Sequence, residues 1–134
     1  MNVVDTSVVV AAFASWHEFH EQAARALDRD PRLPAQAALE AYSVLTRLPP
    51  PHRAPPGVVR DFLLANFAEP WLSLPPERFA EVISELADAG IVGGAAYDAL
   101  IAAVARDAGA TLLTCDLRAR GSYDRVGVPV EYLP

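Results

Sequence analysis

Two short apolar segments, each ending at an acidic residue, constrain the fold of this chain more than any other feature. Asn2-Val3-Val4 stops at Asp5, and Thr111-Leu112-Leu113-Thr114 stops at Cys115-Asp116. Runs this short and this apolar are typical of strands that are buried on both faces. Because helical patterns separate them, we expect an α/β fold, a three-layer sandwich with a mostly parallel central sheet flanked by helices.

The remaining elements follow from apolar residues at helical spacing and from prolines and glycines at the segment ends. We expect two further strands, at Pro70 to Leu74 and at Val128 to Leu133, and a loop or one helical turn between Asp116 and Arg125. The expected helices run from Val8 to Ala14, His17 to Arg29, Pro34 to Leu48, Gly57 to Phe67, Pro75 to Ala89 and Ala95 to Ala108.

The composition agrees with one folded domain over residues 1–134, since 52% of the residues are hydrophobic. Cys115 is the only cysteine, so no intrachain disulfide can form. The apolar stretch from Val8 to Ala14 is shorter than the roughly 20 residues of a membrane span, and no basic leader precedes it. We therefore expect a soluble, cytoplasmic protein without a membrane partner.

Four acidic residues lie in otherwise apolar surroundings, namely Asp5, Glu40, Asp98 and Asp116. An unpaired carboxylate is costly to bury, so acids in such positions are paired, cap a helix or bind a metal ion. Ligands of open α/β sheets bind beyond the carboxyl ends of the strands. Asp5 and Asp116 each follow a predicted strand, which favours a common site at that edge.

Each acid alone also has an ordinary structural explanation. Asp5 can cap the helix that follows it, and Asp116 can begin a turn. Asp98 falls in the first turn of its helix, where a carboxylate complements the helix dipole. Glu40 can be a solvated helix residue. The co-occurrence of the four therefore carries more weight than any one of them.

Read in order, these segments resemble the PIN-domain ribonucleases, in particular the small VapC-type toxins of toxin–antitoxin pairs. The resemblance covers the whole chain and rests on Val3-Val4-Asp5-Thr6-Ser7-Val8, Leu39-Glu40-Ala41-Tyr42-Ser43-Val44-Leu45-Thr46-Arg47-Leu48, Tyr97-Asp98-Ala99-Leu100-Ile101-Ala102 and Leu112-Leu113-Thr114-Cys115-Asp116. It implies a PIN-like fold and a metal-dependent endoribonuclease that hydrolyses RNA phosphodiester bonds and acts as a toxin.

The resemblance also implies a role for each residue of the site. The four acids would be catalytic, with Asp5, Asp98 and Asp116 as the ligands of one or two Mg²⁺ or Mn²⁺ ions. Glu40 would be a further ligand or the base that positions water, and Asp124 is a candidate for an additional acid. The residues that would hold the ligands in place are Thr6, Ser7 and Thr114.

The partners implied by the resemblance are an RNA substrate and a cognate antitoxin protein. A homodimer is also expected, with the apolar surface around Phe13, Trp16 and Phe19 as its candidate interface. Both tryptophans, Trp16 and Trp71, are interpreted as packing or interface anchors. His17 and His20 are three residues apart rather than four, so we interpret them as part of a solvated helix and not as zinc ligands.

A net charge of −6 does not suit a nonspecific nucleic-acid binder, so an RNA substrate requires local basic contacts. The chain has no lysine, and its eleven basic residues are all arginines, whose guanidinium groups can bind two phosphate oxygens at once. Arg47 lies seven residues after Glu40 on the same helical face. Arg118 and Arg120 follow Asp116. These three arginines are the expected substrate contacts.

Two other functions are open to this sequence. A PIN fold can act as a catalytically silent binding module. Alternatively, Asp5 can be the nucleophile of an aspartyl-phosphate hydrolase of the dehalogenase type. That chemistry normally uses a second aspartate two residues later, where this chain has Ser7, and a lysine, which this chain lacks.

Overall fold

A computed structural model describes residues 1–134 and contains three strands, seven α-helices and one 3-10 helix. The strands are short, and the two longest helices have 13 residues each. None of the helices could span a bilayer. In chain order the elements are β1 (Asn2–Val4), α1 (Thr6–Phe13), α2 (His20–Leu27), α3 (Ala35–Arg47), α4 (Pro56–Asn66), α5 (Arg78–Asp88), α6 (Ala95–Asp107), β2 (Thr111–Thr114), η1 (Leu117–Ala119), α7 (Arg120–Val126) and β3 (Val130–Tyr132).

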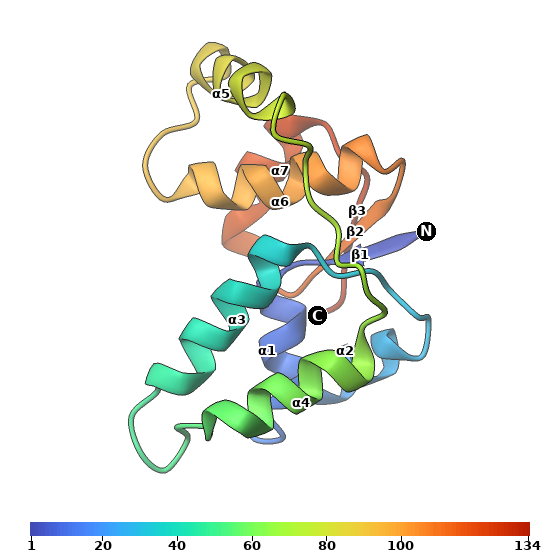
Figure 1. The fold of residues 1–134 in the computed structure, drawn as a ribbon, viewed down its shortest axis with the longest axis vertical. Coiled ribbons are helices and arrows are strands. Elements are labelled where there is room, and N and C mark those ends of the chain that lie inside the picture. Colours follow the sequence, from blue (N-terminus) through green and yellow to red (C-terminus); the bar gives the residue numbers. More distant parts are fainter.

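The sheet has the order β1-β2-β3, and both pairings are parallel. Val3 lies beside Leu112, which in turn lies beside Val130. Figure 1 shows the sheet between α6 and α7 on one side and α1, α2 and α4 on the other. The expected three-layer α/β arrangement with a parallel central sheet is confirmed. Since the strands are parallel, the residues that follow β1 and β2 emerge at the same edge.

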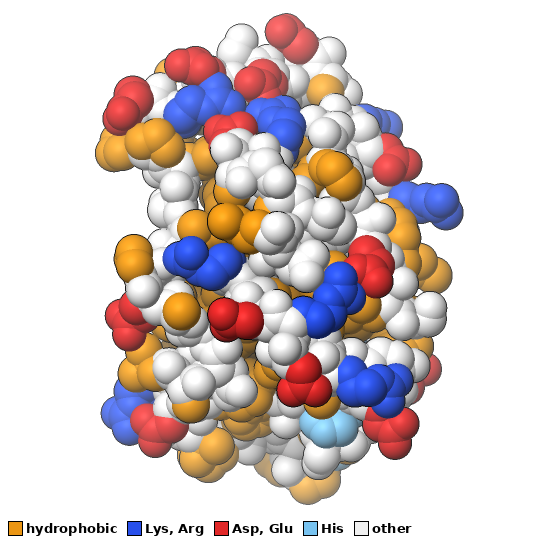
Figure 2. Space-filling model, turned by 90° about the vertical axis from the view of Figure 1, so that its right-hand side faces the viewer, with side chains coloured by type: hydrophobic (Ala, Val, Ile, Leu, Met, Phe, Trp, Pro, Cys, Tyr) orange, Lys and Arg blue, Asp and Glu red, His pale blue; other side chains and the backbone are white.

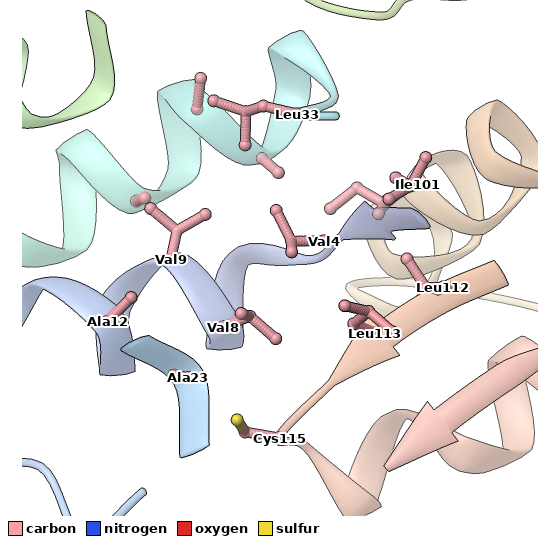
Figure 3. Packing of buried hydrophobic residues seen from close by; sticks show 14 of the residues in the cluster. Val4, Val8, Val9, Ala12, Ala23, Leu33, Ile101, Leu112, Leu113 and Cys115 are labelled. Carbon is pink, nitrogen blue, oxygen red and sulfur yellow. The ribbon is translucent and has the colours of Figure 1, made fainter. Parts of the chain in front are cut away.

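The core forms where the sheet meets α1 on one face and α6 on the other. Val4 and Leu113 lie between Val8 and Val9 of α1 and Ile101 of α6, as Figure 3 shows, and all five are at most 1% exposed. The helices around them bury mainly alanines, and the seven on α3 and α6 are Ala37, Ala38, Ala41, Ala99, Ala102, Ala103 and Ala105. These small side chains allow the helices to lie close to the sheet and so bring α3 and α6 near its carboxyl edge.

The strand expected from Pro70 to Leu74 is wrong. Only one residue of the segment, Leu72, pairs with another backbone, through a single parallel bridge to Pro34. Leu72 donates its N–H to Leu33 O at 2.9 Å and accepts from Ala35 N at 2.8 Å. Proline has no N–H, so the prolines in and around these two segments interrupt the ladder that a longer strand would need.

The loop or single turn expected after Asp116 is also wrong, because η1 and α7 fill this region. Ala119 and Tyr123, four residues apart, are buried on one face of these turns. The sequence Gly121-Ser122 between them has a low helix propensity, and for this reason a helix was not predicted here. Gly127 ends α7 in the left-handed conformation at φ 82°, as C-terminal glycines commonly do.

The second helix begins at His20 rather than at His17. Two successive turns precede it, with His17 N donating to Ala14 O at 2.9 Å and His20 N to His17 O at 3.0 Å. The imidazole Nδ1 of His17 accepts a hydrogen bond from the N–H of Phe19 at 3.1 Å. Such a local bond to a side chain offers the backbone an alternative to the helix. His17 therefore lies in a connection between α1 and α2.

Candidate active site

Asp5 and Asp116 stand at the carboxyl ends of neighbouring strands, as the sequence predicted. Asp5 caps α1, with its Oδ1 accepting from Val8 N at 3.2 Å. Asp116 caps η1 in the same way, with its Oδ1 accepting from Arg118 N at 2.9 Å. Asp5 thus has the capping role that the sequence left open, and Asp116, for which the ordinary explanation was the start of a turn, caps a 3-10 helix. Capping occupies only part of each carboxylate, so it does not exclude a further role.

Glu40 and Asp98 reach the same region from α3 and α6. Glu40 is fixed by two donors: Thr6 Oγ1 lies 2.8 Å from its Oε2, and Gln36 Nε2 lies 3.0 Å from its Oε1. Asp98 lies in the first turn of α6, as predicted, and its carboxylate makes neither a hydrogen bond nor an ion pair within the chain. Asp98 is therefore a half-buried acid without a compensating partner.

Three of the four acids border one hollow of about 550 Å³ at this edge of the sheet. Asp5 is not on its surface but lies beneath it, with only 2% of the residue exposed. The hollow is lined by Thr6, Ser7, Val10, His17, Glu18, Phe19, Glu40, Val44, Asp98, Cys115, Asp116, Leu117, Arg118 and Pro134. The four acids from distant parts of the sequence are thus gathered around one cavity and its floor.

The carboxylate of Asp5 accepts four hydrogen bonds. Oδ1 accepts from Ser7 Oγ at 2.5 Å and from Val8 N, and Oδ2 accepts from Thr114 Oγ1 at 2.5 Å and from Tyr123 OH at 2.7 Å. A carboxylate has about four lone-pair positions, so this one is fully occupied. Its burial raises the pKa of Asp5, and the hydrogen bonds from Ser7, Thr114 and Tyr123 oppose that rise.

Ser7 and Thr114 connect Asp5 to the end of β2. Ser7 Oγ accepts from Cys115 N at 2.8 Å, and Thr114 Oγ1 accepts from Asp116 N at 2.9 Å. Each hydroxyl therefore accepts from the backbone after β2 and donates to the carboxylate after β1. This arrangement fixes the distance between the strand ends that carry the two aspartates.

The acids interact electrostatically. Burial, and then the charges of Asp116, Glu40 and Asp5, raise the pKa of Asp98 from 3.8 to about 6. The basic group closest to the acids is Arg118, whose Nε lies 3.5 Å from Asp116 Oδ1, and its side chain is 96% exposed. Burial likewise raises the pKa of the Cys115 thiol to about 12, which keeps it protonated and inactive as a nucleophile.

No three of these acids are drawn together closely enough to form a ready-made cation site. Repulsion between carboxylates opposes a closer grouping, because like charges raise one another's energy when no cation lies between them. The site is therefore a set of acids around a hollow, all with oxygen donors.

The PIN-domain family model matches residues 3–125 of the chain. Ribonuclease VapC40 of Mycobacterium tuberculosis, in strains CDC 1551/Oshkosh and ATCC 25618/H37Rv, is 51% identical over 127 residues, which are 95% of each chain. The chain belongs to the PIN-domain family. Ribonuclease VapC27 of M. tuberculosis strain H37Rv is 38% identical over 130 residues, 95% of this chain and 93% of VapC27. The fold also matches the crystal structure of FitAcB from Neisseria gonorrhoeae with a TM-score of 0.68, at 24% identity, over 97% of this chain and 96% of that one.

Membership of the PIN-domain VapC ribonucleases identifies the chain as a nuclease, and thus a hydrolase. It agrees with the geometry, which does not suit an aspartyl-phosphate hydrolase. A nucleophilic Asp5 would have to reach its substrate, yet this residue is 2% exposed and all its acceptor positions are used.

The three predicted arginines of this PIN domain do not lie together. Arg118 borders the hollow. Arg47 is exposed and donates to Ser43 Oγ at 3.0 Å, one turn back along α3, and Arg120 stands 5.5 Å from the ring centroid of Tyr132. Neither of these two lines the hollow. Asp124 is exposed on α7 and does not line it either.

Sequence reasoning missed three residues that shape this PIN-domain site. Tyr123, which is 1% exposed, donates to Asp5 from α7, an element that was not predicted. Gln36 supports Glu40 from one turn earlier on α3, a spacing of four residues that could have been noticed. His17 borders the hollow because it lies in a turn, where a helix would have placed it differently.

Proposed function

We propose that this ribonuclease is an endonuclease that requires Mg²⁺ or Mn²⁺ and uses Asp5, Glu40, Asp98 and Asp116 as its catalytic residues. The proposal is carried by the excess of negative charge around the hollow, where Asp98 has no basic partner and its pKa is raised to about 6 beside three other acids. Carboxylates that outnumber the basic groups in a cavity, here with the exposed Arg118 as the one arginine beside them, are a mark of functional sites, and a divalent cation relieves the repulsion between their charges.

The donor set fits the proposed cations. All four groups offer oxygen, which Mg²⁺ and Mn²⁺ prefer, and the site has no histidine–cysteine set of the kind that binds zinc. Asp98 has both oxygens free, and Asp116 uses only one in its contacts with Arg118. Asp5 can join them as a ligand only if one of its four donors turns away. We therefore propose Asp98 and Asp116 as the primary ligands and Asp5 as the third.

A divalent cation held by Asp98, Asp116 and Asp5 would supply positive charge at the scissile phosphate and would make the attacking water more acidic. Glu40 is held by Thr6 and Gln36 at the rim of the hollow, and we propose that it orients the attacking water and accepts its proton, with direct ligation as the alternative. Ser7 and Thr114 keep Asp5 fixed, and Arg118 contacts a phosphate oxygen. Attack by water leaves a 5′-phosphate and a 3′-hydroxyl.

The test is digestion of structured RNA by the purified protein, followed by identification of the product ends. We expect cleavage with Mg²⁺ or Mn²⁺, none in EDTA, and none by Asp5→Asn. A 2′,3′-cyclic phosphate at the new ends, or undiminished cleavage in EDTA, would contradict the mechanism. The matched control is Asp88→Asn, which changes an exposed aspartate at the end of α5 and should cleave like the parent protein. RNA binding without cleavage would instead identify a catalytically silent module.

We also propose that the protein is a toxin that pairs with an antitoxin protein and forms a homodimer. Family membership supports the antitoxin, and an apolar groove supports a protein partner. The groove, of about 490 Å³, lies between α3 and α4 and contains Leu39 and Leu64, which are 65% and 48% exposed. The surface first expected to form the dimer is less continuous, because the ring of Phe13 packs against Phe62 at 5.3 Å between centroids.

Expression of the intact chain should arrest growth, and co-expression of the antitoxin should relieve the arrest. Leu39→Asp should reduce that relief while purified Leu39→Asp protein still cleaves RNA, since the groove lies outside the acid hollow. Unaffected growth beside an active control toxin would contradict the role as a toxin. Sedimentation of the purified chain measures the homodimer.

A further inference from the structure

We propose that an unpaired RNA strand leaves the acid hollow across four aromatic rings, those of Phe19, His17, Trp16 and His52, on which its bases stack. We call these four side chains the aromatic row. The inference rests on the proposed function, because the strand is the substrate of that site. It adds the surface across which the strand passes and the side chains on which its bases stack.

The aromatic row is continuous with the hollow. His17 and Phe19 line the hollow together with Glu40, Asp98 and Asp116, and their rings lie 5.8 Å apart between centroids. From there the ring of Trp16 is 6.0 Å from that of His17, and the ring of His52 is 4.2 Å from that of Trp16.

The outer half of the row is exposed but held in place. Trp16 is 49% exposed, and its closest ring contact is with the exposed His52, not with the core. The structure therefore does not support the earlier interpretation of Trp16 as a packing anchor. The loop that carries His52 is pinned at two points, since Arg53 Nε donates to Leu48 O at 2.9 Å and Ala54 N to Leu45 O at 3.0 Å. An ordered aromatic surface loses little conformational entropy when a ligand stacks on it.

His17 offers a directed polar contact as well as its ring. Its Nδ1 accepts from the backbone N–H of Phe19, so the proton of the neutral imidazole must be on Nε2. Nε2 makes no hydrogen bond within the chain, so it is free to donate to a phosphate or base at the rim of the hollow. Arg53 and Arg118 provide guanidinium groups at the two ends of the path.

Stacking, more than charge, must provide the affinity. Glu18 lines the hollow together with the other acids. On a different side of the molecule, the one shown in Figure 2, acidic and basic side chains are interspersed, and that side has no broad basic surface either. Every base has an aromatic face, but a duplex hides those faces within its own stack. The aromatic row therefore fits an unpaired strand rather than double-stranded RNA.

The test is fluorescence anisotropy of a labelled single-stranded oligoribonucleotide of mixed sequence, titrated with protein in EDTA so that no cleavage occurs. The same strand annealed to its complement is titrated in parallel. We expect the single strand to bind more tightly than the duplex. Trp16→Ala and His52→Ala should each weaken single-strand binding about tenfold, within the range of base–aromatic stacking. Trp16→Phe, which keeps a ring, should restore most of the affinity. Phe79→Ala removes an aromatic side chain that is 40% exposed on α5 and should bind like the parent protein.

Equal affinity for the single strand and the duplex, or unchanged binding by Trp16→Ala and His52→Ala, would overturn the inference while leaving RNA cleavage intact. A parent protein that cleaves no RNA and binds neither probe would overturn the proposed function and this inference together. If the Trp16 and His52 variants lose dimerisation but not RNA affinity, the row is a protein interface and the inference fails. Thermal unfolding of each variant separates these results from misfolding.

Discussion

Replacing Asp98 by asparagine should stabilise the metal-free protein even though it removes a proposed ligand. Burial and three neighbouring acids raise the pKa of Asp98 from 3.8 to about 6, so the ionised carboxylate opposes folding at neutral pH. Asparagine is nearly the same size but carries no charge. The variant therefore removes the repulsion and keeps the packing of α6 against the sheet.

The magnitude follows from the pKa. A tenfold change in a protonation equilibrium corresponds to about 1.4 kcal/mol, so the rise from 3.8 to about 6 amounts to about 3 kcal/mol at most. Asp98 is only half-buried, and solvent screening reduces this to about 1–2 kcal/mol. Loss of a favourable charge in the first turn of α6 removes about 0.3–1 kcal/mol. The net gain is about 1 kcal/mol, or about 3–5 °C in Tm for a domain of this size.

The dependence on pH identifies the cause. The pKa of Asp98 is 3.8 in the unfolded chain and about 6 in the folded protein. Below pH 3.8 the carboxyl is protonated in both states and does not oppose folding, and the folded protein loses stability as the pH rises through about 6. The stability advantage of Asp98→Asn should therefore be absent near pH 4 and fully developed above pH 7. Thermal and urea unfolding in EDTA across this range measure it.

Asp107→Asn is the matched control, because it makes the same substitution at the other end of α6. Asp107 accepts from Arg78 Nε at 2.9 Å and lies 3.4 Å from Arg106 NH2, so its loss should destabilise the protein by up to about 1 kcal/mol. If Asp98→Asn unfolds at or below the Tm of the parent protein at neutral pH, the account of repelling acids is refuted.

Four further substitutions test the packing and the hydrogen bonds that support the site. Tyr123→Phe removes the buried hydroxyl that donates to Asp5, so it should lower the free energy of unfolding by about 1–2 kcal/mol and slow cleavage several-fold. Its control is Tyr132→Phe, which removes a buried hydroxyl without a partner and should be neutral or stabilising. Leu113→Ala empties a fully buried position of β2 and should cost about 2–5 kcal/mol by urea unfolding. Gly127→Ala should cost about 1 kcal/mol in the same measurement, because φ is 82° there while nothing within 4 Å opposes a methyl group.

The positions of Asp5 and Asp116 could be predicted because each follows an apolar strand, and parallel strands end at one edge. Asp98 could be placed at the start of its helix, facing the same edge. Glu40 could only be placed on a helix, because a helical pattern does not fix which face meets the sheet edge. The position of Glu40 depended most on family resemblance, and the structure brings Glu40 and Asp98 to one hollow. The local sequence pattern was thus enough to predict most helices and strands, whereas the position of the site depends on packing between elements that are distant in the sequence.

The missed features share a physical cause. Leu72 pairs by a single bridge that proline limits, and α7 contains Gly121-Ser122, so local propensity opposed what tertiary contacts created. The contact of Tyr123 with Asp5 could not be predicted because α7, which carries Tyr123, was not predicted. His17 was predicted to lie in a helix. It lies instead in a turn beside the acids, where its side chain accepts a hydrogen bond from the N–H of Phe19.

The central claim is that the acids around the hollow act as one cation-dependent site. The most direct measurement is the rate of cleavage of a labelled RNA as the free Mg²⁺ concentration rises from zero, for the parent protein, Asp98→Asn and Asp107→Asn. The account predicts saturating curves for the parent and for Asp107→Asn, and no cleavage by Asp98→Asn at any concentration. Cleavage by Asp98→Asn at the parent rate, or a rate that is independent of Mg²⁺, would contradict it.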